Sequence, residues 1–123
     1  MSFSIGDSEH DAQTHVIEVE GEVDFYTAPE FKQRLTGVID SGKTRLVVDL
    51  SNATFIDSTT LGVLVGSAKR LRPEGGALAV VCTAPSIRKN FEITGLDRVL
   101  AVHSTRDDAL SAVAHPDAAG AGA

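Results

Sequence analysis

The segment 45–50 constrains the fold of this chain more than any other. Leu46, Val47, Val48 and Leu50 leave too few polar positions for a strand that has one face in water. Such a run is typical of a strand that is buried on both faces, near the centre of a mainly parallel sheet. Parallel strands need long crossovers, which are usually helices, so the sequence predicts alternating strands and helices.

Other segments supply further strands. Residues 15–20 alternate, with Ile17 and Val19 on one face and two glutamates on the other, as in a half-buried strand. Phe3 and Ile5 alternate weakly, and we expect them to pair with 15–20 as an antiparallel hairpin whose loop lies around 8–13. Two later apolar runs, 78–82 and 99–102, predict the remaining strands.

Four segments have apolar residues at helical spacing. In the first, Thr27 is expected to cap the helix, Glu30 to complete a capping box, and Gly42 to lie at the end. The second runs over about 58–71, and Pro73 and two glycines end it. The third begins near Ala84 and stops at Gly95, and residues 104–107 are expected to cap the last one.

These elements predict an α/β fold: a mostly parallel central sheet of about five strands, with an N-terminal antiparallel pair and about four helices. A chain of 123 residues suits one domain. We expect the domain to span 1–114. Residues 115–123 are rich in alanine and glycine and are expected to form a flexible tail.

Composition narrows the classes of function. The net charge is −6, and no clustered basic face is evident, which argues against nucleic acid as a partner. No apolar run is long enough to span a bilayer, and no export signal is visible, so we expect a cytoplasmic protein without a membrane partner. The single cysteine, Cys82, and four scattered histidines have no metal-site spacing, and no cofactor motif is present.

Two segments follow predicted strands and lie where parallel sheets place their functional loops: 21–26 and 49–62. In the second, Asp57, Ser58 and Thr59 come together at a helix start. Helix capping alone accounts for them. The alternative is a phosphorylated hydroxyl, because a phosphate is tolerated at a helix N-terminus and adds enough negative charge to disrupt a docked surface.

The segment 49–62 also resembles the signature of the STAS domain family: a strand, Asp-Leu-Ser, a short turn, and Asp-Ser-Ser-Gly-Leu-Gly at the head of a helix. Residues 21–24 with Thr27 and Ala28 resemble the second marker of the family, and 93–97 resemble its C-terminal one. The likeness covers roughly 3–113 in the right order. The chain is therefore similar to anti-sigma-factor antagonists, small regulators without enzymatic activity.

The resemblance implies a partner switch. Soluble STAS proteins bind an anti-sigma factor that is also a serine/threonine kinase, so that a sigma factor is released. Phosphorylation of the second hydroxyl residue of the motif ends binding, and a phosphatase resets the cycle. Carried onto this sequence, Thr59 is the acceptor and Ser58 the fallback. The partner-binding residues would be Asp24, Phe25, Tyr26, Asp57, Ser58, Thr60, Leu61 and Gly62.

Two positions depart from the family pattern. Threonine stands at 59, where serine is commonest, and the family glycine after the acceptor is Thr60, a β-branched residue that is expected to crowd the site. Phe25 and Tyr26 fit a docking patch or a ring that caps the core about equally well. Asp49 is expected to hold the turn that follows it through backbone hydrogen bonds.

Other classes of protein fit the sequence less well. The usual nucleophile and phosphate-loop motifs of enzymes are missing from the sequence. A response-regulator receiver needs a lysine after its last strand, where this chain has residues 103–105. A STAS adaptor that binds a transporter ATPase or a larger signalling assembly, without phosphorylation, stays open as the alternative. The sequence leaves open the particular sigma factor, the input signal and any weak homodimer.

Overall fold

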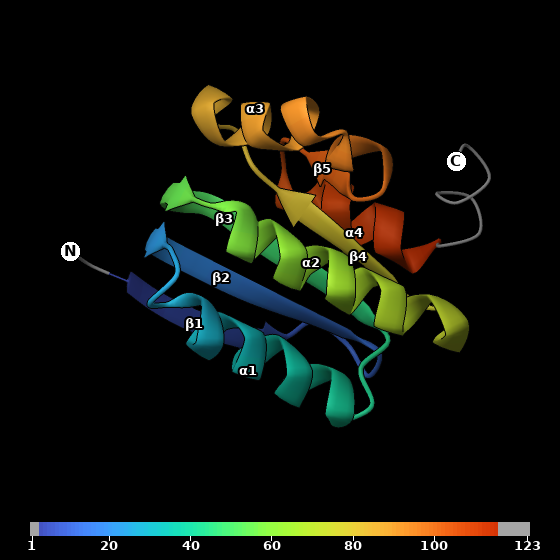
Figure 1. The fold of residues 1–123 in the computed structure, drawn as a ribbon. Helices are drawn as coiled ribbons and strands as arrows, with labels where there is room; N and C mark the ends of the chain where they lie inside the picture. The colour runs from blue at the N-terminus through green and yellow to red at the C-terminus, as the bar shows by residue number, and fades with distance from the viewer. Residues whose placement is uncertain (1–2, 116–123) are drawn as a thin grey trace.

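Strand β3 is the centre of a five-stranded sheet in a computed structural model of the chain, which describes residues 3–115. The strands lie across the sheet in chain order, with β1 and β2 antiparallel and all later neighbours parallel (Figure 1). Their bounds are β1 Phe3–Glu9, β2 Thr14–Val23, β3 Arg45–Ile56, β4 Ala77–Val81 and β5 Ala101–His103. The predicted fold class is confirmed.

Four α-helices and two 3₁₀ turns connect these strands within the described residues: α1 Ala28–Asp40, α2 Ser58–Leu71, η1 Arg72–Glu74, α3 Pro85–Thr94, η2 Leu96–Arg98 and α4 Arg106–Ala114. Helices α1 and α2 lie side by side over one face of the sheet (Figure 1). No helix in the range 3–115 is both long and apolar enough to cross a bilayer. Apart from His115, the tail expected over 115–123 falls outside the described residues.

Burial of β3 on both faces produces two hydrophobic clusters. Leu46, Val48 and Leu50 join the larger one, which also includes residues of α1, α2 and α3. Val47 belongs to the smaller one, which α4 covers with Ala109 and Val113. The residues of β3 from 46 to 50 are all buried, as their composition predicts. Each fully buried Leu or Val contributes about 1.5–3 kcal/mol, so this strand carries much of the core.

Three local details differ from the sequence predictions. Thr27 and Glu30 form no capping box: Thr27 is helical at φ −98°, and its hydroxyl donates to the Glu22 carbonyl oxygen instead. Strand β3 continues to Ile56 beside β2 through irregular pairing, where a turn after Ser51 was expected. The last strand starts at Ala101, because the backbone N–H groups of residues 99 and 100 donate to the Leu96 carbonyl oxygen.

Asp49 lies on the α4 face of β3 and joins two elements. Its Oδ1 accepts from the backbone N–H of Ser51 at 2.9 Å, so the expected backbone hydrogen bond is present, but the segment it holds belongs to β3 and is not a turn. Its Oδ2 accepts from Nη2 of Arg106 at 2.7 Å, at the start of α4. Burial opposes ionisation most strongly, but the hydrogen bonds from Ser51 and Arg106 outweigh it and hold the pKa of the Asp49 carboxyl below its usual value.

Thr60 joins α2 to β2. The side chain is fully buried, and its hydroxyl donates to the carbonyl oxygen of Val23 at 3.0 Å. A buried hydroxyl needs such a partner, because desolvation of an unpaired one is costly. The bond fixes the first turn of α2 over the end of β2.

We expect Arg106→Met to lower the free energy of unfolding by about 1 kcal/mol at pH 7, since the pair is partly exposed. The Asp49 contribution is fully present above its unfolded pKa of about 4 and is lost as pH falls through the lower folded value. The difference between wild type and variant should therefore shrink as the pH falls. Urea unfolding followed by circular dichroism at pH 7 and pH 3 measures this, and equal stabilities at pH 7 would contradict it.

Thr60→Val should lower the free energy of unfolding by about 1–2 kcal/mol, because it leaves the Val23 carbonyl without this donor while it keeps the side-chain shape. Thr59→Val, the same change at the exposed neighbouring position, is the control and should stay within about 0.5 kcal/mol of wild type. The comparison fails if both variants lose the same stability in thermal or urea unfolding.

Candidate functional site

At the N-terminus of α2, four consecutive residues fall into two groups: two that hold the helix start and two that are exposed to solvent. Asp57 is the N-cap, with extended backbone (φ −121°, ψ −176°), and its Oδ1 accepts from the backbone N–H of Thr60 at 3.1 Å. Thr60 then points into the core, whereas Ser58 and Thr59 are exposed. Successive helical residues are about 100° apart around the axis, so neighbours at a helix start face different surroundings. The capping role expected of Asp57 is confirmed.

The side chains of Ser58 and Thr59 are accessible from solvent. Neither hydroxyl makes a hydrogen bond to another group in the part of the chain that the structure describes. Thr59 lies beside Gly62 on the rim of a groove between α1 and α2. A hydroxyl without an intramolecular partner can enter the active site of another protein without breaking contacts in its own.

The structure corrects the expectations for the next two residues. Thr60 does not crowd the acceptor, because its side chain is turned inward and has no exposed surface. Leu61 is 5% exposed and packs in the larger core cluster. Their side chains are not part of an exposed binding surface. Gly62 is exposed, as a binding residue requires.

The loop between β2 and α1 presents two aromatic rings to solvent. Phe25 is 70% exposed and Tyr26 is 86% exposed, so the reading in which one ring caps the core is wrong. The rings pack edge to face, with centroids 5.7 Å apart. Oδ1 of Asp24 accepts from the backbone N–H groups of Tyr26 and Thr27, at 2.9 and 3.1 Å, and so holds the loop in this shape.

Phe55 is a third exposed ring that the sequence analysis missed. It is 48% exposed, and the register of β3 places it opposite Glu22, close to the start of the same loop. Phe55 could have been found if β3 had been predicted to continue beyond Ser51. A turn was expected there instead. Asp24, Phe25, Tyr26, Phe55, Asp57, Ser58 and Thr59 define what we call the switch edge. An apolar centre with a charged rim is the usual anatomy of a protein-docking surface.

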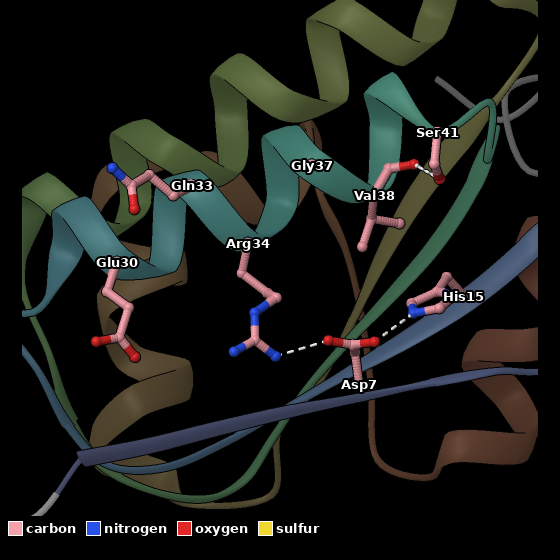
Figure 2. A pocket seen from close by; sticks show the side chains of 8 residues that line it. All are labelled: Asp7, His15, Glu30, Gln33, Arg34, Gly37, Val38 and Ser41. Atoms are coloured by element: carbon pink, nitrogen blue, oxygen red, sulfur yellow. Dashed lines mark hydrogen bonds and ion pairs between the residues drawn. The ribbon is translucent and has the colours of Figure 1, made fainter.

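A second polar cluster, which the sequence did not predict, lies between β1, β2 and α1 (Figure 2). The Asp7 carboxylate accepts from Nε2 of His15 at 2.8 Å and pairs with Nη1 of Arg34 at 2.6 Å. Hydrogen bonds from His15 and then Arg34 hold the pKa of the Asp7 carboxyl below its usual value. The cluster ties the edge strand β1 to α1. No local sequence signal joins residues so far apart in the chain.

Comparisons with known proteins agree with this geometry. The sequence model of the STAS domain family matches residues 7–109 of this chain. An anti-sigma-B factor antagonist of Listeria monocytogenes is 34% identical over 108 residues, which is 88% of this chain and 95% of that protein. One of Staphylococcus aureus, strain NCTC 8325, is 37% identical over 87 residues, covering 71% of this chain and 81% of the relative.

A solved structure gives the same result. The crystal structure of an anti-sigma factor antagonist from Mycobacterium paratuberculosis superposes with a TM-score of 0.84 at 35% identity, covering 91% of this chain and 94% of the other. Sequence and fold thus agree over nearly the whole length of both proteins. The chain belongs to the STAS domain family, and the relatives described above are anti-sigma factor antagonists.

Proposed function

We propose that this protein is a cytoplasmic anti-sigma factor antagonist that binds an anti-sigma factor kinase through the switch edge and so releases a sigma factor. Phosphorylation at Thr59 ends the binding, and a phosphatase restores it. The protein acts as ligand and substrate in this scheme and performs no catalysis itself. The observation that carries the proposal is the exposed Thr59 hydroxyl at the same end of the β2–β3 pair as three exposed aromatic rings, on a chain related to such antagonists.

The charge around Thr59 explains why a phosphate would act as a switch. Asp57 precedes the hydroxyl and Asp24 holds the neighbouring aromatic loop, so the rim is already acidic. A kinase surface that complements this rim is basic or neutral at the contact and accepts an uncharged hydroxyl. A phosphothreonine adds a charge of about −1.5 to −2, which must be desolvated if the partner is to stay bound.

Ser58 is the fallback acceptor, and its side chain is exposed as well. Two features favour Thr59. It occupies the second hydroxyl position of the family motif, and it lies on the groove between α1 and α2, where a bound phosphate has open space. Gly62, one turn further along α2, has nothing within 4 Å of the position that a Cβ would take.

We expect Thr59→Glu to weaken binding to an anti-sigma factor kinase from the same genome at least tenfold, because the added carboxylate must be desolvated where the kinase surface accepts an uncharged hydroxyl. Thr59→Ala should bind as wild type does and should resist inactivation by ATP. Calorimetry gives the affinities, and intact-mass spectrometry after incubation with kinase and ATP gives the phosphate count. Ser58→Ala is the control and should still gain one phosphate. Phosphate that enters Thr59→Ala but not Ser58→Ala would move the acceptor to Ser58.

Tyr26→Ala should raise the Kd for the same kinase at least tenfold, because aromatic side chains at the centre of an interface carry a large share of its binding energy. Ile93 in α3 is 72% exposed and lies outside the switch edge, so Ile93→Ala is the matched control and should leave the Kd unchanged. Similar affinities for the two variants would show that the kinase docks elsewhere.

The adaptor reading predicts a different result in the same experiments. An adaptor would bind a transporter ATPase, and its affinity would be independent of ATP-dependent modification. If neither Thr59 nor Ser58 gains phosphate while a transporter ATPase binds tightly, the adaptor is the correct function.

A further inference from the structure

The groove between α1 and α2 runs from Thr59 along both helices. It has a volume of about 540 Å³ and is lined by Lys32, Thr36 and Ile39 of α1 and by Thr59, Gly62, Val63, Gly66, Ser67 and Arg70 of α2. The α2 residues follow helical spacing and make one continuous stripe. Gly62 and Gly66 both have open space at the Cβ position, so bare backbone forms part of the floor.

Two cations line this groove, and within the described part of the chain only one of them has an acidic partner. Arg70 forms an ion pair with Asp40 at the far end. Lys32 makes no ion pair or side-chain hydrogen bond with any of the residues 3–115. In a chain of net charge −6, a cation that lines a groove and has no acidic partner is available for a new anion.

The ion pair between Asp40 and Arg70 also indicates the register of the two helices. Both helices follow parallel strands and run in the same direction, and Asp40 meets Arg70, thirty residues further along the chain. The same offset places Lys32 level with Gly62, three residues or about 4.5 Å along the axis from Thr59. Helical side chains lean toward the N-terminus, so the Lys32 stem leans toward the level of Thr59.

Packed helices lie about 8–10 Å apart, a gap that a lysine and a phosphothreonine can span together. We propose that Lys32 binds the phosphate on Thr59, so that the phosphorylated protein carries an ion pair between α1 and α2 that the unmodified protein lacks. This inference rests on the proposed function for its modification site. In the inactive, phosphorylated protein, the phosphate would therefore be bound against α1.

The acidic groups near Thr59 work against this ion pair. Asp57 and Asp24 lie on the same edge and repel a phosphate dianion, which raises the midpoint of its second ionisation. Lys32 acts in the opposite direction, since an opposite charge favours the dianion. The titration of the phosphate therefore reports directly on whether Lys32 reaches it.

The test uses the full chain with phosphothreonine installed at position 59 during translation, so that no kinase is needed. The midpoint of the phosphate titration, normally near pH 6, is followed by ³¹P NMR. Lys32→Gln should raise the midpoint by about half a unit at low salt. Lys69→Gln removes the same charge from an exposed residue of α2 that does not line the groove, and it should leave the midpoint unchanged.

Identical midpoints in wild type and Lys32→Gln would overturn the inference, and so would an equal rise in both variants, which would show a diffuse effect of net charge. Kinase incubation of the unmodified protein is scored separately. Failure to phosphorylate either Thr59 or Ser58 there overturns the proposed function, whereas an unshifted titration overturns only the role of Lys32.

Discussion

Burial of β3 between two hydrophobic layers is the constraint on which the rest of the structure depends. Its alternate side chains pack against α1, α2 and α3 on one face and against α4 on the other. Each flanking element is therefore fixed relative to one strand. The β2–α1 loop and the start of α2 follow the ends of β2 and β3, which pair up to Val23 and Ile56. The switch edge exists because these two strands end together.

Within that edge, some residues hold the helix start in place and their neighbours are accessible to solvent. Asp57 and Thr60 hold the first turn of α2 through the cap and through the bond to the Val23 carbonyl. Ser58 and Thr59, between them, make no such bonds and are exposed. A change of charge at Thr59 can therefore alter the surface without breaking the contacts that fold α2. The same separation accounts for threonine at position 60, because its side chain is buried and its hydroxyl donates to the Val23 carbonyl oxygen.

The sequence predicted what depends on local pattern. Strand burial, the bounds of α2, the cap at Asp57 and a cap within 104–107 all follow from spacing of a few residues, and the structure confirms them. Contacts between distant residues could not be predicted. The pairs Asp49 with Arg106 and Asp7 with Arg34 are 57 and 27 residues apart, and no local pattern joins them. Thr60 was misjudged because a β-branched residue after an exposed hydroxyl gives no sign of which way it turns.

The ion pairs of the described residues bear on the role proposed for Lys32. Among the described residues, Arg34 pairs with Asp7, Lys43 with Glu9, Arg70 with Asp40, and Arg106 with Glu18 and Asp49. Each of these pairs stabilises one fixed arrangement of elements. Lys32 has no such partner among the described residues, so a phosphate at Thr59 would compete with no existing ion pair for it. A fold that is already held together elsewhere can gain or lose that contact reversibly, as a switch requires.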